Sequence, residues 1–170
     1  NLFFDAPFEK HAADLYTTPK WPENPLMYVC CPSKTDATVA PEGSENLFVL
    51  IPVAPGMEDN ESIKEHYYKI IMRRLEKRLG TNIQDAVVYK RCYAHNDFVA
   101  DYNAFKGNAY GLANTLTQTA ILKPSIKNKK LINLYYTGQL TVPGPGVPPS
   151  LISGEVVANQ LLQQLKLKTT

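Results

Sequence analysis

A ten-residue stretch rich in proline and glycine lies near the end of the chain and limits what can form there. Residues 139–148 (QLTVPGPGVP) contain three prolines and two glycines, and Gly138 precedes them. Proline lacks an amide donor and glycine favours turns, so neither a helix nor a central strand can pass through this stretch. The apolar run 131–137 predicts a buried strand before it. Residues 149–165 predict a helix after it, whose inner face carries Leu151, Ala158, Leu161, Leu162 and Leu165.

The order of strand, tight loop and helix has a chemical consequence. A helix N-terminus carries unpaired amide groups and about half a positive charge, and here it would lie beside the carboxyl end of a strand. A rigid backbone without bulky side chains suits the electron-rich edge of a cofactor. A purely structural loop and a polyproline-type ligand for a partner protein are the alternatives. A phosphate-binding P-loop is excluded, because no Gly-Lys-Ser/Thr sequence follows.

The rest of the chain predicts a mixture of strands and helices. Apolar runs at 26–31 and 47–53 predict two buried strands, which we expect to pair as antiparallel neighbours. A capping box from Ser62 to Glu65 starts a helix whose apolar residues recur at helical spacing until Gly80. Residues 86–93 predict another strand, whereas Gly107 and Gly111 argue against one long helix in 95–122. The predicted fold class is therefore α+β.

Composition indicates an ordinary globular protein. Of the 170 residues, 44% are hydrophobic and 20% are charged, and no apolar run approaches the roughly 20 residues that a spanning helix needs. The three cysteines are an odd number, and Cys30 and Cys31 are adjacent, so we expect reduced thiols and a cytoplasmic protein. The three histidines lack the spacing of a metal site, so no metal is expected. The chain begins without Met or a signal segment, which suggests the middle of a longer protein.

Charge is distributed unevenly along the chain. Residues 1–62 hold three basic and ten acidic side chains, whereas 63–170 hold fifteen basic and six acidic ones. The basic excess is concentrated within 64–78 and 123–130. Such clusters suit an anionic membrane surface, although a solvated helix face and a polar turn are the simpler interpretation. No motif for reading bases accompanies them, so nucleic acid is not an expected partner.

Three segments together resemble a known family. Asn133 to Gly138 followed by 143–154 (PGPGVPPSLISG) is similar to the C-terminal flavin-binding signature of the phytoene desaturases. These enzymes are the FAD-dependent, carotenoid-desaturating branch of the amine-oxidase-like flavoproteins. Residues 97–111 (DFVADYNAFKGNAYG), with Gln118 and Pro124, resemble their substrate-side segment, and 32–48 resemble their strand pair.

The resemblance implies a C-terminal fragment of an oxidoreductase of carotenoid biosynthesis. Residues 1–125 would form part of the substrate domain, a mixed or mostly antiparallel sheet with flanking helices. Residues 126–170 would supply a terminal strand and helix that complete the FAD domain. The G-x-G-x-x-G motif that binds the FAD pyrophosphate in this family does not occur in the chain. We therefore expect the isolated chain to be inactive and to bind FAD poorly without the missing N-terminal FAD domain.

The resemblance also assigns roles to particular residues. In the family, hydride passes from a methylene beside the polyene to the flavin, and reduced flavin carries negative charge. The implied cofactor-binding residues are Gly138, Gly144, Gly146, Val147, Pro148 and Ser150. Family members often carry a small or acidic residue two positions after the strand-end glycine and a His before the Pro-Gly. Leu140 and Val142 occupy those positions here, which removes any polar contact from these two side chains.

Candidates for catalysis and substrate binding lie upstream. His95, Asp97 or Asp101 could accept the proton, although Asn96 or Asp97 would also suit an N-cap position. Tyr93 and Tyr110 could line a tunnel for a long apolar polyene, with ordinary core packing as the alternative. The expected substrate is phytoene or a related polyene. A carotenoid isomerase or ketolase of the same superfamily and a non-catalytic binding module are the competing functions, and peripheral association with the inner membrane surface is the expected location.

Overall fold

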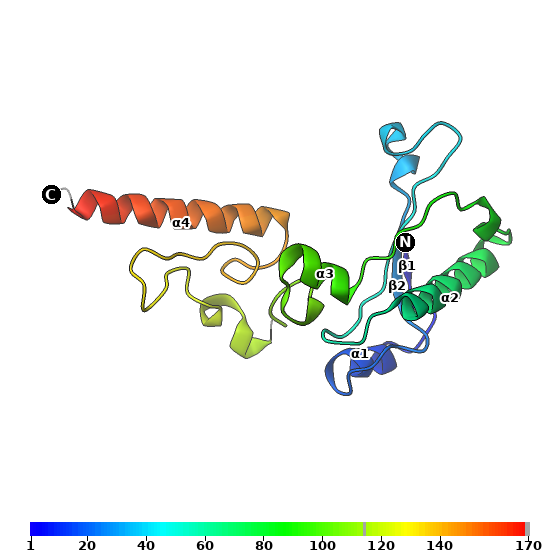
Figure 1. Ribbon diagram of the computed structural model, residues 1–170, viewed down its shortest axis with the longest axis horizontal. Coiled ribbons are helices and arrows are strands. Elements are labelled where there is room, and N and C mark those ends of the chain that lie inside the picture. Colours follow the sequence, from blue (N-terminus) through cyan, green and yellow to red (C-terminus); the bar gives the residue numbers. More distant parts are fainter. Residues whose placement is uncertain (114, 169–170) are drawn as a thin grey trace. The chain divides into compact units, whose positions relative to one another are not determined.

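A computed structural model describes residues 1–113 and 115–168 of the chain (Figure 1). The chain divides into two compact units, residues 1–107 and residues 108–170. The first unit contains strands β1 (Leu2–Phe3), β2 (Met27–Cys30) and β3 (Phe48–Leu50) and helices α1 (Phe8–Tyr16), α2 (Glu61–Leu79) and α3 (His95–Tyr102). The second contains α4 (Val147–Lys168). The predicted α+β class is confirmed.

The sheet has the order β1-β2-β3, and both pairings are antiparallel. Tyr28 in β2 lies opposite Leu2 and Leu50, so the central strand is paired on both edges. The predicted strands near 26–31 and 47–53 and their antiparallel pairing are therefore confirmed. Strand β1 was not predicted, because its two residues are too few to show a period.

Helix α2 packs its apolar face on this sheet (Figure 1). Met72 and Leu75 form the buried core with Met27 and Val29 of β2. The predicted helix is confirmed, and it ends at Gly80, which has a left-handed φ of 70°. The predicted start is wrong. The N-cap is Asn60, whose side chain accepts a hydrogen bond of 2.9 Å from the Ile63 amide, and it precedes Ser62 by two residues.

Two predicted strands do not form. Residues 84–86 make a 3-10 turn, and 87–94 continue as irregular backbone. Val88 is 95% exposed, so the apolar alternation of this segment covers no core. Residues 131–137 are also irregular, and their only bridge in the described chain joins Lys127 to Tyr135. In both segments the apolar pattern is present but no described strand pairs with it.

The predicted inner face of the last helix is also wrong. Its five members are exposed, Leu151 by 72% and Leu165 by 61%. Helix α4 instead contacts the preceding segment through polar side chains, because Ser153 is fully buried and Gln164 accepts a hydrogen bond from the Tyr135 hydroxyl. The contacting face therefore consists of hydrogen-bonding residues, and the leucines lie away from it.

The buried phenol of Tyr67 predicts a loss of stability at high pH. Its hydroxyl donates a 2.7 Å hydrogen bond to the Pro22 carbonyl, and its ring lies 4.8 Å from the Trp21 ring. Burial raises the pKa of Tyr67 to about 12. A pKa raised by folding means that the contribution to stability is complete below pH 10 and is lost as pH rises through 12.

We therefore expect the free energy of unfolding, measured with urea through Trp21 fluorescence, to fall between pH 10 and pH 12. The Tyr67→Phe variant should lose about 1 kcal/mol at neutral pH and give a flatter alkaline profile. Tyr89, which is 77% exposed, provides the control, and Tyr89→Phe should retain the wild-type profile. An alkaline profile unchanged in Tyr67→Phe would show that Tyr67 does not couple to unfolding.

Candidate functional site

The Pro/Gly loop of the second unit depends on its glycines. Gly138, Gly144 and Gly146 have φ values of 99°, 136° and 113°. These values lie in the region that only glycine adopts without strain. Helix α4 begins at Val147, two residues earlier than predicted. The three predicted cofactor-binding glycines thus define the path of the loop into the first turn of the helix.

Three of the six predicted cofactor-binding residues offer no free amide. The Gly138 amide donates to Ser153 Oγ at 2.6 Å, and the Ser150 amide donates to the Gly146 carbonyl at 3.0 Å. Pro148 has no amide hydrogen. Ser153 was not predicted for this site, because the helix was expected to turn its leucines inward.

The other three predicted residues, Gly144, Gly146 and Val147, present amides that no acceptor in the described part of the chain uses. They follow one another along the loop and precede the first turn of α4, where the helix dipole adds positive potential. This arrangement can accept negative charge or an electron-rich group.

Lys123 lies against the same loop and was not predicted as a site residue. It is 8% exposed. A Cβ atom built on Gly144 would lie 3.4 Å from its Cε and 3.7 Å from its Nζ. In the sequence, Lys123 belongs to the basic cluster 123–130. We expected all of that cluster to lie at the surface.

The candidate catalytic residues all lie on α3 in the first unit. His95, its first residue, is 6% exposed, and its Nε2 lies 2.7 Å from the Ala54 carbonyl oxygen. Because a carbonyl only accepts, Nε2 carries the hydrogen in this contact. Nδ1 is buried and has no partner among the described residues. The ring also meets the Trp21 ring edge-on at 5.6 Å.

Asp97 caps the helix from inside its first turn. The N-cap is Ala94, so the alternative that Asn96 or Asp97 occupies this position is wrong. The Asp97 carboxylate accepts hydrogen bonds of 2.9 Å from the Ala94 amide and 3.0 Å from Lys64 Nζ. Partial burial raises the pKa of Asp97, but these two bonds outweigh it and hold the pKa below its usual value. Asp97 is therefore an ionised structural cap.

Asp101 and Tyr93 form a pair on the exposed side of α3. The Tyr93 hydroxyl donates to the Asp101 carboxylate at 2.7 Å, and the Tyr93 ring meets the Phe98 ring edge-on at 4.8 Å. Desolvation and the bond to Asp101 raise the pKa of Tyr93 to about 12, so it stays protonated. Tyr110 belongs to the other unit and is 63% exposed, so it does not pack in a core.

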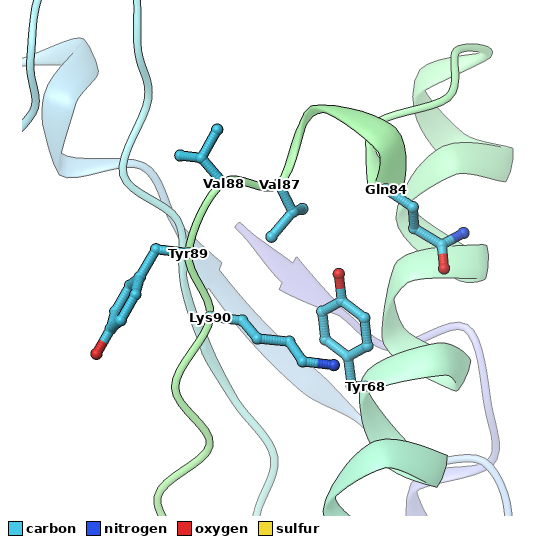
Figure 2. A pocket seen from close by; sticks show the side chains of 6 residues that line it. All are labelled: Tyr68, Gln84, Val87, Val88, Tyr89 and Lys90. Atoms are coloured by element: carbon cyan, nitrogen blue, oxygen red, sulfur yellow. The ribbon is translucent and has the colours of Figure 1, made fainter.

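A shallow pocket of about 280 Å³ lies between α2 and the irregular segment after it (Figure 2). Tyr68 and Lys90 point toward each other across it, with Lys90 Nζ 4.0 Å from the centre of the Tyr68 ring, whereas Tyr89 points away. Gln84, Val87 and Val88 complete the lining. None of the predicted site residues lines this pocket. The pocket itself was not expected, because residues 86–93 were predicted to form a strand.

Neither a metal site nor a membrane-spanning helix occurs in the described residues. The described part of the chain contains no group of three or more His, Cys, Asp or Glu side chains placed to share a metal ion. Among residues 1–113 and 115–168, no helix combines the length and the apolar composition that a membrane span requires.

Comparison with known proteins gives consistent matches, although no family model matches the chain. The chain is 42% identical over 164 residues to a carotenoid 3,4-desaturase of Haloarcula japonica, which covers 96% of this chain and 33% of that protein. It is 30% identical to a zeta-carotene-forming phytoene desaturase of Myxococcus xanthus over 95% of the chain. It is also 30% identical to a lycopene-forming phytoene desaturase of Paracoccus over 96% of the chain. The chain spans about one third of the length of these curated relatives.

Proposed function

We propose, from the homology of this chain to the carotenoid and phytoene desaturases, that it forms the C-terminal part of an FAD-dependent enzyme that desaturates phytoene or a related polyene. The observation that carries the proposal is a match extending over 96% of the chain at 42% identity. Similarity of this extent includes both the predicted substrate-side segment and the Pro/Gly loop. A match to a single glycine pattern would support only the loop, whereas this match supports the substrate-side segment and the loop together.

The Pro/Gly loop fits one edge of a flavin. The amides of Gly144, Gly146 and Val147 have no protein acceptor in the described chain, and they stand at the positive end of α4. FAD, when bound, supplies the hydride acceptor. The three amides would donate to the carbonyl and nitrogen atoms of its pyrimidine edge and stabilise negative charge there. Gly138, Pro148 and Ser150 would shape this loop without donating to the flavin.

The two domains predicted from the sequence would have different roles. Residues 1–125 would contribute to the substrate domain, and 126–170 would complete the FAD domain. Tyr93 and Tyr110 would contact the polyene. Of the three proton-acceptor candidates, His95 has a buried ring nitrogen, Nδ1, with no hydrogen-bond partner among the described residues, whereas Asp97 and Asp101 each accept hydrogen bonds.

Peripheral association with an anionic membrane surface belongs to the same proposal, because the substrate is insoluble. Exposed basic side chains follow one face of α2 at helical spacing, Lys69, Arg73 and Lys77, with Arg78 beside them. Lys129 and Lys130 are exposed in the turn before the Pro/Gly loop. Clusters of this kind are attracted to acidic lipid headgroups on the cytoplasmic leaflet.

The test requires a full-length protein that contains this chain. We expect it to be purified yellow with FAD and to convert phytoene into products that absorb at longer wavelength. An isomerised or oxygenated product would instead favour a carotenoid isomerase or ketolase. A colourless, stable protein would favour a non-catalytic binding module.

Substitution at Val147 tests the loop amides directly. Proline is accepted at the first position of a helix, so Val147→Pro removes one amide hydrogen and leaves the helix start intact. We expect FAD affinity in the full-length protein to fall about tenfold, the effect of one lost hydrogen bond. Val147→Ala removes the exposed side chain but keeps the amide, and should bind FAD as the wild type does. Equal affinities in the two variants would contradict the proposed role of this amide.

A further inference from the structure

The three-stranded sheet has one face that α2 covers and one face that stays exposed. Side chains alternate between the two faces along each strand. Met27 and Val29 of β2 lie in the core against α2. Tyr28, between them, lies on the other face, is 38% exposed, and is paired with Leu2 and Leu50. We call this second surface the open face, and its members are Leu2, Tyr28, Cys30, Phe48 and Leu50.

The open face is as apolar as the covered one. None of its five residues is charged, and Leu2 and Phe48 are 68% and 52% exposed. The Phe48 ring meets the Tyr28 ring at 61°, with 6.3 Å between the ring centres. An antiparallel sheet that faces water ordinarily alternates apolar and polar residues, whereas apolar residues on both faces are typical of a sheet between two packed layers. The strands therefore have the composition of a middle layer.

The shape of the open face favours a protein layer over a small ligand. Ligand sites are concave, because a cleft buries most of the ligand surface. The pocket beside α2 is lined by other residues, and so is a second cavity of about 170 Å³ beside α1. The open face is one side of a sheet, and the side of a sheet suits a helix or a second sheet packed flat against it.

Charge and length decide between the remaining occupants, which are a lipid surface, a second copy and the rest of a longer polypeptide. Residues 1–62 include all three strands and hold ten acidic and three basic side chains, so an anionic membrane would repel them. The chain spans about one third of the length of its curated relatives. A layer within the same polypeptide is tethered and acts at a high effective concentration, which a separate copy does not reach.

We propose that the open face is an interface within the full-length protein, covered by an apolar layer from the part of the polypeptide that lies outside this chain. The inference rests on the proposed function, because it requires the chain to belong to a protein of the relatives' length. The covering surface should present aliphatic and aromatic side chains, since the open face offers no partner for a buried charge. The sheet is then the middle of three layers, with α2 as one outer layer.

Cys30 lies on the open face and reports whether that face is covered. Its thiol is free and only partly buried in the 170-residue chain. Cys31→Ser keeps this thiol and removes its neighbour. Cys30→Ser keeps Cys31 instead, which follows the end of β2, lies 3.3 Å from the Ser33 hydroxyl and serves as the matched control.

Pulse labelling with N-ethylmaleimide, located by mass spectrometry, measures the modification rate of each thiol in the native full-length protein and in the 170-residue chain. We expect Cys30 to react at least about tenfold more slowly in the full-length protein, because a covered thiol reacts only after local opening. Cys31 should react at a similar rate in both proteins.

Each other occupant gives a different result. Equal Cys30 rates in the two proteins, or an equal slowing of Cys30 and Cys31, would overturn the inference. Protection of Cys30 in the 170-residue chain that increases with its concentration would identify a second copy, and protection that requires added phytoene would identify the substrate. Both results overturn the inference as well. A full-length protein that binds FAD and leaves Cys30 reactive overturns this inference alone, whereas one that protects Cys30 but binds no FAD overturns the proposed function alone.

Discussion

Replacing Lys64 by methionine is expected to destabilise the first unit by about 3 kcal/mol at neutral pH, the low end of the range for breaking a buried ion pair. Lys64 Nζ lies 3.0 Å from the Asp97 carboxylate and 3.9 Å from Asp59 Oδ1. The Asp59 side chain is completely buried, and its Oδ1 has no hydrogen-bond partner among the described residues. The variant would leave the carboxylates of Asp59 and Asp97, and the exposed one of Glu61, without the cation that they share.

The size of this deficit should depend on pH. In the wild type the pKa of Asp97 is held below its usual value of 3.8, so its contribution is complete above that pH and is lost as pH falls through the lower, folded value. In Lys64→Met the cost arises from ionised carboxylates, and protonation relieves it. The two stability curves should therefore approach each other as pH falls from 7 to 4. Urea unfolding monitored by Trp21 fluorescence measures both.

A second lysine of α2 supplies the matched control. Lys69 Nζ lies 3.8 Å from the Glu65 carboxylate, and both side chains are about half exposed. Surface pairs of this kind contribute little, so Lys69→Met should leave the unfolding curve nearly unchanged at every pH. If Lys64→Met were no less stable than Lys69→Met, or if its deficit were the same at pH 4 and pH 7, the buried network would not hold α3 as we describe.

This network marks the boundary of what the sequence could predict in the fold. The strands near 26–31 and 47–53 and helix α2 were predictable because their apolar period and the terminating glycine are local signals. Lys64 and Asp97 are 33 residues apart, and no local pattern pairs them. The failures at 86–93 and 131–137 have the complementary cause, since a strand pattern needs a partner strand that the described chain does not provide.

The candidate site divides in the same way. The turn glycines of the loop were predictable, because residue type alone indicates where a left-handed φ is tolerated. Which amides remain free was not predictable, because it depends on Ser153 reaching the Gly138 amide across 15 residues. The burial of Lys123 against Gly144 was hidden for the same reason, since a lysine in a polar turn is ordinarily exposed.

Substitution of Gly107 by alanine is expected to destabilise the first unit by about 4 kcal/mol, from backbone strain and from a clash with α3. Gly107 has a φ of 64°. A Cβ atom there would lie 2.6 Å from both the Cα and the carbonyl oxygen of His95. These are backbone atoms at the start of a helix, where a rotamer change cannot relieve the contact. The helix start is also fixed by the bond from the Asn96 amide to Asp59 at 2.9 Å.

Gly80 separates the two contributions. It has a φ of 70°, but a Cβ atom there would meet nothing within 4 Å. Gly80→Ala therefore carries the strain without the clash and should cost about 1 kcal/mol. Thermal unfolding followed by Trp21 fluorescence reports both variants, because this single tryptophan lies against Tyr67 and His95 in the first unit. Gly107 lies against the start of α3, the helix that carries His95, Asp97 and Asp101. Equal melting temperatures for the two variants would therefore mean that this helix can shift without cost. The positions of the three residues would then not be fixed by this contact.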